Sequence, residues 1–257
     1  MAESDAKGGA EAAAKDAVDA SAATPRARYR AQVRAEVKEH AWKQIAEAGA
    51  SALSLNAIAK QMGVSGPALY RYFAGRDELI TELIRDAYRS LADAVRAAAA
   101  TGAGVRRLAH VLRGWALADP HRYFLIFGTP VPGYHAPEDI TGISQEIMAD
   151  LLAACAALGP DAPGEGAGGA QGGARAGASV AEPCAAFEAH IADHRDWAGG
   201  LAAPPAVLRR ALAFWTRLHG VLSLELAGHF AGMGFDPALL YEAELDGLLG
   251  PEGMPGG

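Results

Sequence analysis

The sequence has little cysteine, few aromatic residues and no long uncharged apolar run. Two cysteines in 257 residues cannot form the disulfide framework of a small secreted protein, so a reducing compartment is expected. The longest uncharged apolar segment, residues 123–137, contains Pro130 and Pro132 and is shorter than the roughly 20 residues of a membrane-spanning helix. The acidic, alanine-rich N-terminus lacks the apolar core of a signal peptide. These absences predict a soluble cytoplasmic protein with no membrane partner.

Runs in which valine, isoleucine or threonine alternate with polar residues are also missing, so no β-sheet is expected. Apolar residues recur instead at four-residue spacing in a helix predicted over about 30–48: Val33, Val37, Ala41 and Ile45. Further helices are predicted over 76–100, 105–118, 120–127, 139–158, 184–198, 205–231 and 237–249. The sequence therefore predicts an all-α fold.

Low-complexity segments suggest the domain organisation. Residues 1–28 are rich in alanine with scattered charge and are expected to be a disordered extension. A glycine- and alanine-rich segment at 159–182 is expected to be a flexible insertion between helices, and residues 251–257 a loose tail. The remainder divides into an N-terminal domain at 29–95 and a helical domain at 96–250.

The charge is unevenly distributed. The whole chain has a formal charge of −7, which argues against nucleic-acid binding. Residues 26–76, however, hold nine basic and three acidic side chains, for a net charge of +6. A short basic block near the N-terminus is therefore the place to look for a contact with DNA.

Residues 53–73 read LSLNAIAKQMGVSGPALYRYF and contain two helix starts. Ser54 can cap a short helix, and Gly63 can end it in the left-handed conformation. Ser65 can cap the next helix after one residue, and Pro67 fits the first turn of that helix, where no N–H is needed. Two short helices joined by so tight a turn indicate a helix-turn-helix.

The second helix of this motif would lie in the major groove of DNA. Its outer face presents Tyr70 and Arg71, with Tyr72 to one side; Arg71 can contact a base edge or a phosphate, and the tyrosine hydroxyls can donate to phosphate. Arg76, at the start of the following helix, can add a phosphate contact. The alternative is a helical hairpin with a solvated face.

The segment GVSGPALYRYFAGRDEL resembles the signature of the TetR family of transcriptional regulators: a Gly-Val-Ser turn, Leu-Tyr, an aromatic pair ending in Phe, and a basic residue before an acidic helix start. The resemblance covers about residues 30–90. It implies a three-helix DNA-binding domain in which Ser65, Tyr70, Tyr72 and Arg76 face DNA. The candidate DNA-binding residues are Ser54, Asn56, Ser65, Gly66, Pro67, Tyr70, Arg71, Tyr72 and Arg76.

One departure from the family pattern affects specificity. A Lys or Thr often precedes Leu-Tyr, whereas Gly66-Pro67-Ala68 offers no side-chain donor here. Backbone contacts, thymine methyl groups and DNA shape are therefore expected to contribute more to sequence preference.

The C-terminal half resembles the Trp-His-Gly subgroup of the family, through Trp215, His219 and Gly220 and through the segment DPHRYFLIFGTPVPGY. The resemblance implies dimerisation through the helices at 205–231 and 237–249. An apolar small molecule is the expected effector, and the candidate ligand-binding residues are Trp115, Tyr123, Phe124, Phe127, Trp215 and His219. The alternative is that these aromatic residues form the core and that His219 is structural.

Enzyme and metal functions have little support. His190 and His194 share a helical face, but no third ligand with metal-site spacing follows, and no phosphate-binding glycine loop is present. No cofactor and no metal are expected. The predicted function is a one-component DNA-binding regulator, a ligand-released repressor that binds a palindromic operator as a homodimer. An activator, a ligand-independent regulator, or a helical enzyme or binding protein with an incidental helix-turn-helix are the alternatives.

Overall fold

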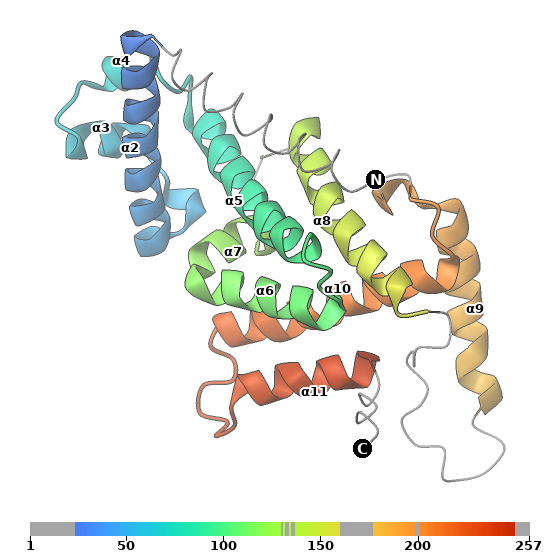
Figure 1. Ribbon diagram of the computed structural model, residues 1–257. Helices are drawn as coiled ribbons and strands as arrows, with labels where there is room; N and C mark the ends of the chain where they lie inside the picture. The colour runs from blue at the N-terminus through green and yellow to red at the C-terminus, as the bar shows by residue number, and fades with distance from the viewer. Residues whose placement is uncertain are drawn as a thin grey trace. The chain divides into compact units, whose positions relative to one another are not determined.

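The computed structural model describes residues 24–129, 131, 134, 137–159, 177–198 and 201–249, with only the backbone described for 177–183. All regular elements within these residues are helical, which confirms the all-α prediction (Figure 1). The chain divides into two compact units, residues 1–80 and 81–257. The division lies within helix α5 (Arg76–Ala99), which also contains the predicted boundary at residue 95.

Three predicted segments lie partly or wholly outside the described residues: the N-terminal extension up to residue 23, residues 160–176 of the insertion, and the tail 251–257. Residues 25–28 of the predicted extension are helical, because α2 begins at Pro25. Residues 177–182 of the predicted insertion are helical as well, because α9 begins at Gly177. The low-complexity composition did not reveal where these two helices start. Alanine and arginine favour a helix, whereas the neighbouring glycines disfavour it.

The first unit contains α2 (Pro25–Ala48), the 3-10 turn η1 (Ala50–Ala52), α3 (Leu55–Gln61), α4 (Gly66–Leu69) and the start of α5. Thr24 caps α2, its Oγ1 accepting from the N–H of Ala27 at 3.2 Å, and Pro25 occupies the first turn. Gly49 ends the helix at φ 79°, where a side chain would be strained. Figure 1 shows α3 and α4 on one side of α2.

A small apolar core joins the helices of the first unit. Its buried members are Val37, Ala41, Ile45, Leu53, Leu55, Ile58, Ala59, Leu69, Phe73, Leu79 and Ile80. Val64 is 41% exposed, because it lies in the turn that Gly63 opens at φ 68°. The burial of Leu53 and Ile58 on either side of Ser54 fixes the entry of the chain into α3.

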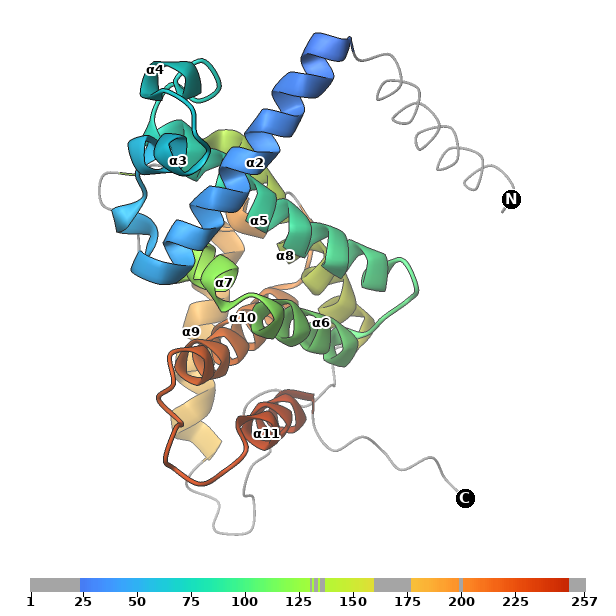
Figure 2. The ribbon, with the colours of Figure 1, turned by 90° about the vertical axis from the view of Figure 1, so that its left-hand side faces the viewer.

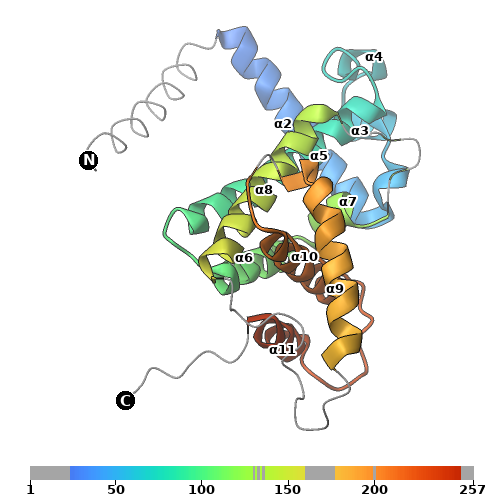
Figure 3. The same ribbon diagram turned by 90° about the vertical axis from the view of Figure 1, so that its right-hand side faces the viewer.

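The second unit contains the rest of α5 and seven further elements: α6 (Val105–Ala118), α7 (Pro120–Phe127), α8 (Glu138–Ala157), α9 (Gly177–Asp193), η2 (Asp196–Ala198), α10 (Pro205–Leu226) and α11 (Pro237–Leu249). Helix α10 packs against α6, α8, α9 and α11 (Figures 2 and 3). It ends at Leu226 rather than 231, because the chain turns through Gly228, Gly232 and Gly234 at positive φ.

Helix α8 packs inside the second unit although it is apolar enough to span a membrane by length and composition alone. Its Ile143, Ile147 and Leu152 belong to the core, and it contacts α6 and α10. The buried Arg210 of α10 donates to the carbonyl oxygens of Cys155 (3.2 Å) and Gly159 (2.9 Å), which ties the C-terminal end of α8 to α10.

Candidate functional site

The α3–α4 turn is fixed by hydrogen bonds at both ends of α3. Ser54 Oγ accepts from the N–H of Ala57 at 3.3 Å, and the N–H of Ser54 donates to Oε1 of the buried Gln44 at 3.0 Å. At the other end, the N–H of Val64 donates to the carbonyl of Ala59 at 3.0 Å. Both polar groups at the start of α3 are therefore occupied, and Ser54 acts first as a helix cap.

The predicted contact residues of α4 are mostly exposed. Ser65 sits at the N-cap but makes no side-chain cap bond, which leaves its hydroxyl accessible; Pro67 and Arg71 are exposed, and Tyr70 is 47% exposed. Helix α4 spans a single turn, and residues 70–72 continue as turns rather than as helix. The side chains aimed at DNA therefore start from a short, tightly anchored segment.

Asn56 and Gly66 lie against each other. Asn56 is exposed at the start of α3, and a Cβ atom built on Gly66 would lie 3.1 Å from its Oδ1. A larger residue at 66 would push the asparagine away. The glycine that departs from the family pattern thus permits a close approach of α3 to α4.

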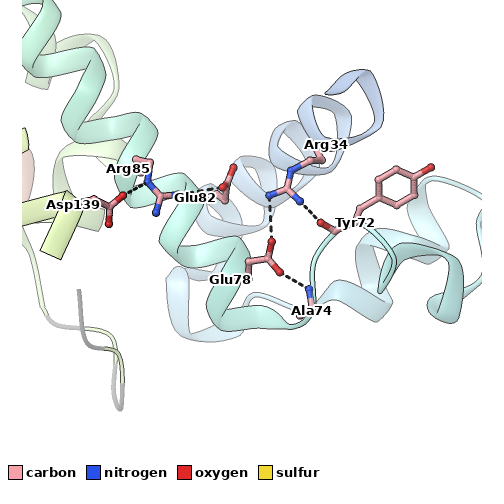
Figure 4. Close-up of polar contacts among 7 residues, drawn as sticks. All are labelled: Arg34, Tyr72, Ala74, Glu78, Glu82, Arg85 and Asp139. Atoms are coloured by element: carbon pink, nitrogen blue, oxygen red, sulfur yellow. Dashed lines mark hydrogen bonds and ion pairs between the residues drawn. The ribbon is translucent and has the colours of Figure 1, made fainter. Parts of the chain in front are cut away.

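Arg34, which entered the sequence prediction only as part of the basic block, forms contacts at the C-terminal end of the helix-turn-helix (Figure 4). Arg34 of α2 donates to the carbonyl oxygen of Tyr72 and to Glu78 Oε1 at 3.3 Å, and its guanidinium lies 4.1 Å from the Phe73 ring centroid. Glu78 Oε2 accepts from the N–H of Ala74 at 2.6 Å. The half-buried Tyr72 projects its ring away from these contacts.

Arg76 has an internal role as well. Its Nη2 donates to the carbonyl oxygens of Ala50 (3.0 Å) and Ser51 (3.3 Å), so that the guanidinium ties the start of α5 to η1. A phosphate contact by Arg76 stays a prediction, and a substitution there would disturb the fold of the motif as well as any contact with DNA.

Six other basic residues of the first unit are exposed and form no ion pair with any residue that the structure describes. They are Arg26, Arg28, Arg30, Lys43, Lys60 and Arg71. Arg30 lies 5.7 Å from the ring centroid of Tyr72, which places the start of α2 near the end of the α4 segment. These six residues, called the exposed cations below, are available to an anionic partner.

The second unit contains a cavity of about 350 Å³. Four aromatic residues, called the aromatic wall below, line it: Tyr88, Phe127, Trp197 and Trp215. Three polar residues of α8, called the polar row below, line it as well, beside Ile147 and Met148: Thr141, Ser144 and Gln145. None of these lining residues is charged. The volume and the lining suit a small, mostly apolar molecule.

His219 packs against two rings of the aromatic wall. Its ring centroid is 4.3 Å from that of Phe127 and 4.2 Å from that of Trp215. Its Nδ1 is 2.9 Å from the hydroxyl of the buried Tyr123, which is also 2.9 Å from Ser223 Oγ. Burial lowers the pKa of His219 to about 4, so the imidazole is neutral at physiological pH.

The structure separates the predicted ligand residues into two groups. Phe127 and Trp215 line the cavity. Trp115 is in the core and donates to Ser90 Oγ at 2.9 Å, while Tyr123 is fully buried and Phe124 packs against the core. The cavity is also lined by Tyr88, Trp197 and the polar row, none of which the sequence prediction included. A signal was present for the polar row, since three uncharged polar residues at helical spacing interrupt an apolar helix.

The second unit also exposes two rows of small or apolar residues. Thr216, Gly220 and Leu224 follow one another at four-residue spacing on α10, and Leu239, Ala243 and Gly247 do so on α11. Other leucines of the same two helices, Leu218, Leu222, Leu245 and Leu248, are buried in the core of the unit itself. A helix with one strongly apolar stripe uses that stripe in its own domain first.

Ion pairs fasten α8 to the second-unit part of α5. Arg85 Nε donates to Asp139 Oδ2 at 2.7 Å and lowers the pKa of that carboxyl group; it also pairs with Glu82 at 3.1 Å (Figure 4). Arg89 and Arg96 both pair with Glu146. Asp139 and Glu146 flank the polar row in sequence, so the helix that lines the cavity is held directly on α5.

No metal site emerges within the described ranges, where no group of three or more His, Cys, Asp or Glu side chains could hold an ion. His190 and His194 stack at 4.2 Å, and His194 Nδ1 lies 2.9 Å from the carbonyl of His190. Burial raises the pKa of the Cys155 thiol to about 12, which leaves it protonated and unreactive at neutral pH.

Comparison with known proteins assigns both units to one family. Residues 39–83 match the model of bacterial regulatory proteins of the tetR family, and residues 105–248 match the model of the tetracyclin repressor-like C-terminal domain. The HTH-type transcriptional regulators Mb1846 of Mycobacterium bovis and Rv1816 of Mycobacterium tuberculosis are each 36% identical over 224 residues, which span 84% of this chain and 90% of the relative.

Solved structures agree with this assignment. The chain is 65% identical to the regulatory protein SCO4313, with a TM-score of 0.75 over 89% of this chain and 100% of that one. A protein of unknown function from Rhodococcus sp. RHA1 shares the fold at 21% identity, with a TM-score of 0.55 over 84% of this chain and 93% of that one. The chain belongs to the TetR family of DNA-binding transcriptional regulators.

Proposed function

We propose that this regulator is a repressor that binds a palindromic operator as a homodimer and leaves DNA when a small molecule occupies its second unit. The observation that carries the DNA-binding part is the exposed end of the helix-turn-helix. There Ser65, Tyr70 and Arg71 are accessible, while Arg34 and Arg76 are engaged in holding the motif together. Neighbouring exposed cations supply the charge that phosphates require. Such a protein acts in the cytoplasm, without catalysis.

The candidate contacts fall into two kinds. Ser65, Tyr70 and Tyr72 are suited to phosphate contacts, which position the protein without reading sequence, whereas Arg71 can also reach a base edge. Asn56, Gly66 and Pro67 would face the groove, and Ser54 would contribute through its cap position. Arg76 would add a phosphate contact while it keeps its hydrogen bonds to η1.

The homodimer is proposed to form through the exposed rows of α10 and α11. A Cβ atom added to Gly220 meets no described residue within 4 Å, and we propose that this position faces a second copy. Two copies would give a four-helix bundle and present their α4 segments about 34–36 Å apart, one turn of DNA. The ligand part of the proposal is supported by the cavity, whose described lining residues are uncharged. Helix α8, which carries the polar row of that lining, forms an ion pair with α5, and α5 begins in the first unit.

Gel-shift titration against the DNA upstream of the protein's own coding sequence, at two salt concentrations, tests the proposal. A specific complex should form, and its affinity should fall steeply as salt rises. Absence of any sequence-preferring complex at either concentration would refute DNA binding at this region. In vitro transcription from the same DNA then separates repressor from activator.

The matched test of the dimer compares Gly220→Leu with Gly114→Leu, since Gly114 is an exposed glycine of α6 whose added Cβ atom likewise meets no described residue within 4 Å. Analytical sedimentation should show that Gly220→Leu is a monomer and that Gly114→Leu remains a dimer. Equal oligomeric states of the two variants would place the interface elsewhere.

A further inference from the structure

A buried polar atom near the cavity has no partner. Nε2 of His219 is inaccessible to solvent and makes no hydrogen bond within the described residues, while Nδ1 on the opposite side of the ring is held by Tyr123. Leaving a buried donor or acceptor unpaired destabilises a protein, because the desolvated group gains no hydrogen bond in return. Such an atom in a native fold calls for an explanation, and a missing ligand group is one of the explanations that fits.

Two aromatic rings lie close to the imidazole and also line the cavity. The ring centroids of Phe127 and Trp215 are 4.3 and 4.2 Å from that of His219, and both residues belong to the aromatic wall. The ring centroids of Phe127 and Trp215 are 5.6 Å apart, and both rings lie close to the imidazole as well as lining the cavity. A rotation of one ring would bring a molecule in the cavity within reach of the imidazole.

The lining also indicates the charge of that molecule. An ionised ligand would lose its hydration without gaining a counter-ion from the described lining residues, none of which is charged. The nearby Arg85, Arg89 and Arg96 are paired with carboxylates of α8. The imidazole is neutral as well, since burial holds the pKa of His219 near 4.

We infer that the effector is an uncharged molecule with an aromatic or fused-ring body and a hydroxyl group, and that this hydroxyl group pairs with Nε2 of His219 once the Phe127 ring moves aside. A hydroxyl group both donates and accepts, so it satisfies either tautomer of the imidazole. The aromatic wall would stack on the ring body, and the polar row would contact its opposite edge. The inference rests on the proposed ligand control and specifies the chemistry of its ligand.

Calorimetric titration of the full-length protein with three probes that share one ring system tests the inference. The probes are 2-naphthol, naphthalene and naphthalene-2-sulfonate. We expect 2-naphthol to bind about tenfold more tightly than naphthalene, the effect of one buried hydrogen bond, and the sulfonate to show no binding. Equal or tighter binding of the sulfonate, or no binding of any probe, would overturn the inference.

Three variants locate the site. His219→Phe keeps a ring of similar size and should reduce the affinity for 2-naphthol to that for naphthalene, while leaving naphthalene unchanged. Ser144→Trp should fill the cavity and abolish binding, whereas Ala153→Trp, at an exposed position of the same helix, should not. A preference for 2-naphthol that survives in His219→Phe contradicts the role of the histidine, and undiminished binding in Ser144→Trp contradicts the location.

The same preparations separate this inference from the proposed function. A specific DNA complex in gel shifts, together with no binding of 2-naphthol, would refute only the ligand chemistry. Binding of 2-naphthol without any specific DNA complex would refute only the proposed operator binding.

Discussion

In the first unit six exposed cations form no ion pair with the described residues, whereas eight described arginines of the second unit lie within ion-pair distance of a carboxylate: Arg85, Arg89, Arg96, Arg106, Arg113, Arg122, Arg209 and Arg217. Paired cations contribute to a fold and cancel their own field, while unpaired ones leave a positive surface for phosphates. The arrangement of charge, rather than its sum, therefore distinguishes the DNA-binding unit from the regulatory unit.

The two units also differ in what holds them together. The first unit has a small core, and Arg34 and Arg76 hold its turns through bonds to backbone carbonyls. The second unit has a large apolar core that encloses the Tyr123–His219–Ser223 hydrogen bonds. A short recognition segment needs polar bracing because it buries little surface, whereas a bundle of long helices gains its stability from packing.

The largest expected effect tests the paired arginines of the regulatory unit. Arg113 and Glu225 pair at 2.6 Å, with side chains only 19% and 14% exposed. Arg113→Ala should lower the free energy of unfolding by about 3 kcal/mol, because it leaves the carboxylate unpaired and largely buried. Arg107→Ala, at an exposed position of the same helix, should change it by less than about 0.5 kcal/mol. Urea denaturation measures both, and equal losses would mean that pairing does not matter.

A second effect follows from the buried histidine of the regulatory unit. The native pKa of His219, about 4, lies below the ordinary value of 6.5, so the unfolded chain takes up a proton that the native protein does not. The free energy of unfolding should keep its full value above pH 6.5 and should decrease as the pH drops toward 4. The decrease should reach about 2 kcal/mol at pH 5. In His219→Phe this part of the pH dependence should be absent. His121→Phe, at an exposed position of α7, should retain it.

A third, smaller effect tests the division among the arginines of the DNA-binding unit. Arg34→Met should lower the free energy of unfolding by about 1.5 kcal/mol, through the loss of its hydrogen bonds to Tyr72 and Glu78. Lys43→Met, at an exposed position of the same helix, should be nearly neutral. The salt dependence of DNA binding should shrink only in Lys43→Met. A loss of stability in Lys43→Met together with a smaller salt dependence in Arg34→Met would contradict the assignment of Arg34 to the fold and Lys43 to DNA.

The smallest effect on the fold, although not on function, is expected at Arg71. Arg71→Ala should leave the free energy of unfolding within about 0.5 kcal/mol of the parent, because the side chain is exposed. Affinity for the operator should fall about tenfold, and the slope of log K against log salt should decrease by about 1 if Arg71 contacts phosphate. An unchanged slope with altered base preference would assign Arg71 to a base edge instead.

Several parts of the fold could be predicted from local signals. The spans of α6, α7 and α11 agree with the predicted helices at both ends, because a glycine, aspartate or proline marks each start. The helix-turn-helix could be recognised because Ser54, Gly63 and Pro67 act within one turn of their own position. The start of α2 was placed too late, since its first turns are polar and no apolar period marks them.

The candidate sites depended more on packing. The sequence by itself determined the helical class, the position of the DNA-binding motif and the positive charge of its surroundings, because these follow from residues close together in the chain. Only the tertiary structure decided that Arg34 and Arg76 hold the motif while Arg71 stays exposed, and that Phe127 and Trp215 line a cavity while Trp115 and Tyr123 do not. Residues of one type with similar local spacing differ in role through contacts with residues distant in sequence, and such contacts leave no periodic signal in the chain.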